Sequence, residues 1–272
     1  MPEGPEVHRA ARRLARALEG RPLLDVSVGL ERLEPWAGRL IGATTTRVEA
    51  RGKAFVLLFD VGAALYVHLQ LYGRWMVRRA GDWPRTGRSL RVALHTDRQM
   101  ALLYSASDVQ MLEPAALAAQ PYLAKLGPDP CDPATTLDQV RAQVASERFR
   151  RRGLGGLLLD PAFVAGVGNY LRSEVLFDAQ LRAARRPGGL EPRELDALAR
   201  ALLALPRRSL ATGGVTAPPD EVAAGRAAGL PRRRWRHRVF AQAGQPCPRC
   251  GAPVTRTTVT GRRLYSCAKC QV

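Results

Sequence analysis

The chain has 272 residues, enough for one core or a few smaller units, and its 46% hydrophobic residues exclude disorder over most of its length. Its 42 Lys and Arg against 24 Asp and Glu give a formal net charge of +18, which exceeds what solubility requires. No apolar run is long enough to span a membrane and no signal pattern opens the chain, so we expect a cytoplasmic protein. On charge alone the partner is a nucleic acid, the ribosome or an acidic protein.

The first predicted element is a helix over residues 5–18. Glu6 lies in its first turn, where a carboxylate favours the positive helix end, and Gly20 supplies a natural stop. Its apolar stripe at helical spacing consists of Val7, Ala11, Leu14 and Leu18. Residues 2–4 then form a short non-helical lead-in.

Residues 23–112 show short apolar runs rich in Val, Leu, Phe and Tyr, separated by Gly, Asp and Pro. The clearest runs are 55–59, 64–69, 90–94 and 100–104. This pattern predicts a mainly antiparallel sandwich or barrel.

After the proline-rich stretch 128–133 the strand signals disappear, and Thr135 or Thr136 can cap a helix that begins near Leu137. Further helices are predicted over 145–159, 170–177 and 192–205. Residues 213–236 mix Gly, Ala, Pro and Arg, and we interpret them as a flexible basic linker or loop.

Two Cys-x-x-Cys pairs near the C-terminus are the strongest local signal. They are Cys247 with Cys250 and Cys267 with Cys270, separated by sixteen residues. Two such pairs can present four thiolates tetrahedrally to one Zn²⁺. A redox-active cysteine pair or a chance spacing would produce the same motif. With all four positions filled by sulfur, the metal would fold a small unit rather than catalyse.

Two further segments favour phosphate contacts. The hairpin between the cysteine pairs carries Arg256, Arg262 and Arg263 at or near its tip, unless that tip is only a solvated turn. The turn Gly166-Val167-Gly168-Asn169 precedes a predicted helix and offers free N–H groups, although such turns are often only turns.

Conventional catalytic sets are absent from the sequence. The histidines show no metal spacing, and neither a phosphate-loop lysine motif nor a serine nucleophile elbow occurs. The N-terminus offers an alternative, because an α-amine has a pKa near neutrality and Pro2 would supply one once Met1 is removed. Glu3 could then shuttle protons, although Met-Pro-Glu-Gly is by itself an ordinary start.

Several short motifs together resemble one family. Met1 to Val7, Arg51-Gly52-Lys53, Gln70-Leu71-Tyr72-Gly73, Leu158-Leu159-Asp160, Gly166 to Asn169 and the cysteine pairs resemble the formamidopyrimidine-DNA glycosylase and endonuclease VIII family over essentially the whole chain. Within it, Asn169-Tyr170-Leu171-Arg172 and Ser105-Ala106-Ser107-Asp108 look like the bacterial endonuclease VIII branch. That branch implies oxidised pyrimidines such as thymine glycol as lesions.

The resemblance also implies roles for individual residues. Pro2 would be the nucleophile, Glu3 the proton donor and acceptor, Glu6 a further active-site carboxylate and Lys53 a phosphate contact that supports catalysis. The residues that fill the gap left by a flipped nucleotide would be Gln70, Leu71 and Tyr72. Asn169 and Arg262 would grip phosphates beside the lesion.

The resemblance therefore implies an α+β, multidomain protein. We expect an N-terminal helix and antiparallel β-sandwich over residues 1–122, a helix-two-turn-helix domain with a basic linker over 123–232, and a zinc-ribbon finger over 233–272. The expected activity is removal of oxidised bases from duplex DNA, followed by β,δ-elimination, by a bacterial monomer with one structural zinc. A non-catalytic nucleic-acid-binding protein and a ribosome-associated zinc protein are the alternatives.

Overall fold

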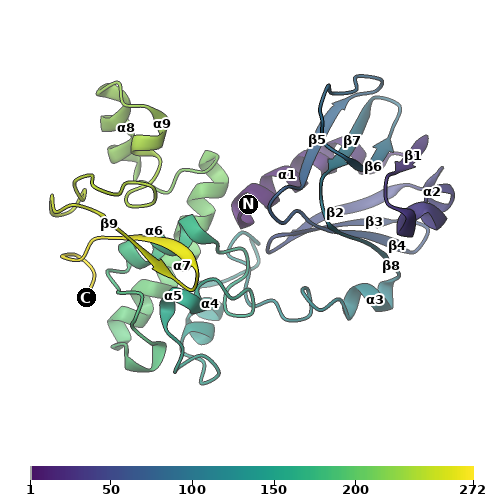
Figure 1. Cartoon of the computed structure of the whole chain (residues 1–272). Helices are drawn as coiled ribbons and strands as arrows, with labels where there is room; N and C mark the ends of the chain where they lie inside the picture. The colour runs from purple at the N-terminus through teal and green to yellow at the C-terminus, as the bar shows by residue number, and fades with distance from the viewer. Residues whose placement is uncertain (1) are drawn as a thin grey trace. The chain divides into compact units, whose positions relative to one another are not determined.

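The computed structural model describes residues 2–272, which form two compact units (Figure 1). The first holds Pro2 and Glu6–Lys125, and the second holds Glu3–Pro5 and Leu126–Val272. The predicted fold class is confirmed, with an antiparallel sandwich, a helical region and a C-terminal hairpin in chain order. This hairpin, residues 247–270 between the predicted zinc ligands, is called the zinc hairpin. The zinc hairpin belongs to the same compact unit as the helices, so the division into three domains stays a prediction.

Helix α1 (Gly4–Leu18) confirms the predicted N-terminal helix. Its stripe of Val7, Ala11, Leu14 and Leu18 is buried in the core of the first unit. Burying each large aliphatic side chain contributes about 1.5–3 kcal/mol, so the helix is held by this face rather than by its arginines.

The predicted sandwich is confirmed as two antiparallel four-stranded sheets in the first unit (Figure 1). One sheet has the order β1 (Asp25–Val28), β6 (Leu90–His95), β7 (Gln99–Tyr104) and β5 (Arg74–Arg79). The other has the order β2 (Thr45–Arg51), β3 (Ala54–Phe59), β4 (Ala63–His68) and β8 (Asp108–Leu112). The helical elements between and after these strands are η1 (Glu31–Leu33), α2 (Glu34–Leu40) and α3 (Pro114–Ala118).

Alternate residues of the central strands belong to different clusters. Phe55 and Leu57 of β3 lie in the shared core with α1, whereas Ala54 and Val56 lie in a separate buried cluster that Tyr122 packs against. Because both faces of these strands are covered, their sequences are continuous apolar runs rather than alternating ones.

The second unit contains helices, one short 3₁₀ helix and a C-terminal hairpin. Its elements are α4 (Leu137–Val144), α5 (Leu154–Leu157), α6 (Asn169–Asp178), η2 (Pro187–Gly189), α7 (Pro192–Thr212), α8 (Pro219–Ala227), α9 (Arg232–Trp235), β9 (Thr255–Val259) and β10 (Arg262–Ser266). The predicted start of α4 is confirmed, with Thr136 and Gln139 forming a reciprocal capping box. In the part of the chain that the structure describes, no helix has the length and apolarity needed to cross a bilayer.

Two predictions in this unit were wrong. Residues 213–236 are not a flexible loop, because α8 and α9 form there and Trp235 packs against Gly225. Its indole N–H also donates to the Leu230 carbonyl at 3.0 Å. Residues 145–159 contain only the short α5 rather than a long helix, because the N–H groups of Leu154 and Gly155 bond to residues 185 and 183 instead of continuing a helical ladder.

Candidate active site

The carboxylate of Glu3 is held by backbone N–H groups at the start of α6. Gly168 donates to it at 2.8 Å, Tyr170 at 2.8 Å and Leu171 at 3.2 Å, and the side chain is buried. These donors lie at the positive end of a ten-residue helix, where a negative charge is favoured. The arrangement fixes both carboxylate oxygens of Glu3, the residue that directly follows Pro2 in the chain.

Glycine is required at two points of this cradle. A Cβ at Gly168 would lie 2.4 Å from Cδ of Glu3, and a Cβ at Gly4 would lie 2.9 Å from Cα of Gly166. Gly4 also donates to the Gly166 carbonyl at 2.8 Å. The glycine-rich turn is therefore used for close approach to Glu3 and Gly4, a role that the sequence did not indicate.

Arg172 joins the start of α6 to the zinc hairpin. Its guanidinium is fully buried and donates to Oδ1 of Asn169 at 2.8 Å. It also donates to the carbonyls of Gly155 at 2.9 Å and Arg263 at 3.0 Å, and more weakly to those of Val259 and Arg262. Burial lowers the pKa of Arg172, and the nearby charge of Arg262 lowers it further. The Asn169 side chain and the Arg262 backbone carbonyl thus both accept hydrogen bonds from the Arg172 guanidinium.

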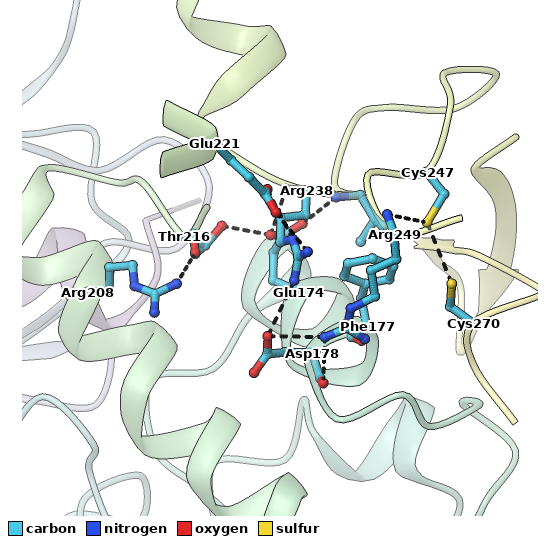
Figure 2. A network of polar contacts seen from close by, with 11 residues as sticks. Glu174, Phe177, Asp178, Arg208, Thr216, Glu221, Arg238, Cys247, Arg249 and Cys270 are labelled. Atoms are coloured by element: carbon cyan, nitrogen blue, oxygen red, sulfur yellow. Dashed lines mark hydrogen bonds and ion pairs between the residues drawn. The ribbon is translucent and has the colours of Figure 1, made fainter. Parts of the chain in front are cut away.

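Glu174 anchors the segment that leads into the zinc hairpin, as Figure 2 shows. Its Oε1 accepts from the N–H groups of Val239 and Phe240, both at 2.8 Å. Its Oε2 accepts from the N–H of Arg238 at 2.9 Å and from the Thr216 hydroxyl at 2.8 Å. A buried carboxylate with four donors is well compensated, so Glu174 ties α6 to residues 216–240.

His237 connects that network to the Glu3 cradle. Its ring stacks on Tyr170 with centroids 4.9 Å apart, and its Nδ1 lies 2.8 Å from the Thr216 hydroxyl. Burial lowers the pKa of His237 to about 3, and the charges of Arg236 and Arg232 act in the same direction. His237 is therefore neutral near pH 7 and stacks on the residue whose N–H binds Glu3.

The four clustered cysteines fit one structural zinc ion. All their sulfur atoms lie within 4.8 Å of one another, with Cys247 and Cys270 at 3.8 Å and Cys250 and Cys267 at 3.5 Å. Tetrahedral zinc with Zn–S bonds of about 2.3 Å separates its sulfurs by about 3.8 Å, so the cluster has the required size. The clustered cysteines agree with the predicted single structural zinc, and the metal would hold the hairpin that carries Arg262.

In the first unit, residues 70–73 form a tight turn at the end of β4. Gln70 has a positive φ of 54°, and Gly73 donates to the Leu69 carbonyl at 2.8 Å. Leu71 and Tyr72 are 68% and 73% exposed, so two adjacent large side chains lie outside the core. The turn presents two apolar groups to solvent.

Lys53 also belongs to the first unit and follows the positive-φ residue Gly52 between β2 and β3. Its backbone N–H donates to the Tyr122 hydroxyl at 2.9 Å. Burial lowers the pKa of His68, and the charge of Lys53 lowers it further, whereas Asp108 opposes the shift. Ala54, the residue after Lys53, pairs with His68 across β3 and β4. Pro2 and Glu6 are half-buried members of the same unit, and Met1 lies outside the described residues.

Three domain models match the chain in order. They are the formamidopyrimidine-DNA glycosylase N-terminal domain over residues 1–108, the formamidopyrimidine-DNA glycosylase H2TH domain over residues 126–218, and the zinc finger found in FPG and IleRS over residues 244–272. Endonuclease 8 of Escherichia coli (strain K12 / DH10B) is 45% identical over 271 residues, an alignment that covers 100% of both chains. The chain therefore belongs to the formamidopyrimidine-DNA glycosylase and endonuclease VIII family.

Other members of the family agree with this assignment. Endonuclease 8 of Klebsiella pneumoniae (strain 342) is 44% identical over 271 residues and is also covered completely. The complex of Lactococcus lactis Fpg with DNA containing an abasic site has a TM-score of 0.81 over 99% of both chains, and at 20% identity it shows a shared fold. The assignment to a DNA-repair glycosylase family with an H2TH domain and an FPG-type zinc finger is confirmed.

Proposed function

We propose that this protein is a base-excision-repair glycosylase and abasic-site lyase that acts as a monomer on oxidised pyrimidines, thymine glycol among them, in duplex DNA. The lesion preference is supported by the 45% identity to Endonuclease 8 over the whole chain. The chemistry rests on Pro2, whose secondary amine becomes available when Met1 is removed.

In the first step the Pro2 nitrogen attacks C1′ of the damaged nucleotide. The N-glycosidic bond breaks, and the base leaves with the bonding electrons and takes up a proton. The amine proton is lost and the C1′–O4′ bond breaks, so that O4′ takes up a proton and an iminium ion is left between Pro2 and C1′. Glu3, which directly follows Pro2 in the chain, would supply and remove these protons.

In the second step the iminium ion acidifies the C2′–H bond. Removal of that proton breaks the C3′–O bond by β-elimination, and removal of the C4′ proton breaks the C5′–O bond by δ-elimination. Both reactions release a phosphate as the leaving group, and water finally hydrolyses the imine to regenerate the Pro2 amine. The strand is left with a one-nucleotide gap.

The observation that carries this proposal is the buried cradle of Glu3. A surface glutamate near an ordinary N-terminus would be solvated, whereas Glu3 is 4% exposed and accepts three backbone N–H bonds. Groups held in a fixed geometry before the reaction avoid the cost of orienting them in the transition state. Because Pro2 immediately precedes this anchored carboxylate, the arrangement supports a catalytic N-terminus over DNA binding alone.

In each unit, the remaining predicted residues would contact DNA. Arg172 holds Oδ1 of Asn169, so the amide N–H₂ of Asn169 is the part that would donate to a phosphate, and the exposed Arg262 would grip a second one. Leu71 and Tyr72 would fill the gap in the duplex when the lesion swings out. Lys53 would contact the phosphate of the lesion, and Glu6 would be a further active-site carboxylate.

Borohydride trapping tests the proposal directly. Purified protein is incubated with a duplex that carries thymine glycol, reduced with borohydride, digested and mapped by mass spectrometry. We expect a covalent adduct on the peptide that begins with Pro2. A matched preparation that retains Met1 should give no adduct, because its Pro2 nitrogen is an amide.

Failure to trap an adduct would contradict the proposal. If intact mass shows Met1 absent, and neither a thymine glycol duplex nor an abasic-site duplex gives an adduct, the protein is a non-catalytic nucleic-acid-binding member of this fold. An adduct with the abasic site alone would retain the lyase chemistry and reject thymine glycol as the lesion.

A further inference from the structure

An arginine-lined groove lies on the first unit. It has a volume of about 680 Å³ and is bounded by α1, β5 and residues 84–88. Six of its lining residues are arginines and none is acidic. The six are Arg13, Arg16, Arg74, Arg78, Arg85 and Arg88.

The charges of this groove are poorly compensated. Within residues 2–272 only Arg78 of the six has a carboxylate within 4.0 Å, namely Asp82 at 3.7 Å. The smaller hollow beside α4 and α7 differs, because Asp196 pairs there with both Arg141 and Arg200. Adjacent guanidinium groups repel one another within a Debye length of about 8 Å, so the arginine groove is set up to bind an anion.

The lining residues indicate phosphate groups rather than bases. Guanidinium groups match phosphate oxygens in a bidentate manner. The only aromatic residue lining the groove, Trp75, is 9% exposed and offers no open ring face on which a base could stack. The groove is therefore suited to a sugar–phosphate backbone of any sequence.

The groove is continuous with the turn that carries Leu71 and Tyr72. The Arg88 guanidinium donates to the Tyr72 carbonyl at 2.8 Å, and Arg74 begins β5 one residue after Gly73. DNA that contacts Leu71 and Tyr72 would thus have its backbone close to Arg74 and Arg88. This continuity favours DNA over an acidic protein as the occupant.

We propose that the arginine groove is a second, sequence-independent DNA site that binds the phosphate backbone of the duplex flanking the lesion. This inference rests on the proposed function, because only a glycosylase acts on a lesion that DNA can flank. Its test measures DNA binding and does not require the protein to cleave DNA. The site would lengthen the stretch of DNA that the protein contacts and would hold the protein on undamaged duplex.

The test compares two triple variants with equal loss of charge. The groove variant is R13Q/R16Q/R85Q, which leaves Arg74 and Arg88 beside the Tyr72 turn unchanged. The control is R12Q/R47Q/R98Q, whose arginines are exposed, belong to the first unit and do not line the groove. Glutamine keeps the helix propensity of α1, and R85E alone, outside any helix or strand, provides a second groove variant.

Binding is measured by fluorescence anisotropy on undamaged duplexes of about 10 and about 30 base pairs at several salt concentrations. For the groove variant we expect Kd on the long duplex to rise about tenfold or more, and the salt slope to become shallower by about 2–3, or 0.9 for each lost phosphate contact. The control and the short duplex should change much less.

Equal losses for the groove and control variants, or equal losses on both duplex lengths, would overturn the proposal, because only net charge would then matter. It would also be overturned if the groove variant lost affinity for polyglutamate and kept its affinity for the long duplex. Borohydride trapping of wild-type protein separates the two proposals. An adduct without the salt-slope difference rejects the groove alone, and the slope difference without an adduct rejects the chemistry alone.

Discussion

The Glu3 cradle of the second unit and the Gln70–Gly73 turn of the first are built in opposite ways. Glu3 is buried and is held by backbone donors of a helix that is itself almost wholly buried. Leu71 and Tyr72 are exposed, and their positions depend on a short turn with one left-handed residue, Gln70. The proposed chemical group is thus positioned by tertiary packing, whereas the proposed wedge is positioned by local backbone geometry.

This difference predicts how each region responds to substitution. Changes around Glu3 should act through geometry and reduce the chemical step strongly, even when no proposed functional residue is replaced. Changes at the turn should act only where the DNA has to be opened, and their effects should be smaller.

The largest effect is expected for Gly168→Ala. The added methyl would lie 2.4 Å from Cδ of Glu3, so the carboxylate or the start of α6 has to move. A displacement of about 1 Å at a reacting group costs about 100-fold in rate, so single-turnover excision of thymine glycol should fall by about that factor or more. Trapping on a pre-formed abasic site should fall less, because no base has to leave.

Gly153→Ala is the matched control for this substitution. Its φ is −65° and its added methyl would meet only the Ala183 carbonyl at an ordinary 3.6 Å. Excision at the wild-type rate by the Gly168→Ala protein would show that the Glu3 cradle is not needed for the reaction.

Arg172→Met should have the next largest effect. The substitution leaves Oδ1 of Asn169 and several buried carbonyls without their donor, and each such group costs about 1–3 kcal/mol. Asn169 and the Arg262 hairpin should lose their fixed geometry, so Kd for a lesion duplex should rise about 10- to 100-fold with a salt slope shallower by about 1–2.

Two further variants separate geometry from charge in that experiment. Arg172→Lys keeps the charge without the planar fork and should recover only part of the affinity. Arg193→Gln removes one exposed charge from α7 and should leave Kd nearly unchanged. If Arg172→Met binds DNA with the wild-type salt slope, Arg172 does not position the phosphate grips.

A smaller effect is expected for Leu71→Ala. Without the exposed leucine the gap left by the flipped nucleotide is filled less well, so excision from a fully paired duplex should slow about tenfold. Excision from single-stranded DNA should change less than about twofold, because no base stack has to be opened. Leu24→Ala removes another exposed leucine of the first unit and should change neither rate. Equal slowing on both substrates would reject the wedge role.

The contrast between the two regions also explains what the sequence could predict. The stripe Val7, Ala11, Leu14 and Leu18 and the paired cysteines follow repeating spacings, so the N-terminal helix and the zinc hairpin are readable from the letters alone. Four strands of the sandwich, β3, β4, β6 and β7, were readable as apolar runs too, whereas β1, β2, β5 and β8 lack a clear run.

The parts that escaped prediction depend on tertiary contacts. The residue types of Arg172, Ser173 and Glu174 do not by themselves predict that all three side chains are buried. Their place at the centre of a short apolar helix is the one sequence signal that could have indicated it. Helix α8 was missed because a composition rich in Gly, Ala, Pro and Arg hid the Pro219 start and the acidic first turn of Asp220 and Glu221. The arginine groove was missed because its members come from three separate segments.

A further test of the cradle, on stability rather than on reaction rate, concerns His237. Its pKa in the folded protein is about 3 against an ordinary 6.5, so between these values the unfolded chain binds a proton that the folded chain excludes. The free energy of unfolding should therefore decrease as pH falls from about 6.5 towards 3, by up to about 1.4 kcal/mol per pH unit from this group. In His237→Phe the decrease should be shallower by that amount.

Denaturant unfolding of wild type and His237→Phe between about pH 4.5 and 7 measures the difference in slope. Both proteins keep the same four cysteines, so proton-driven loss of zinc contributes equally to each and cancels in the comparison. Identical slopes would mean that His237 takes up its proton in the folded state. A charged ring would then lie against Tyr170, whose N–H holds Glu3, and the cradle would respond to pH through that stack rather than remain fixed as the buried geometry predicts.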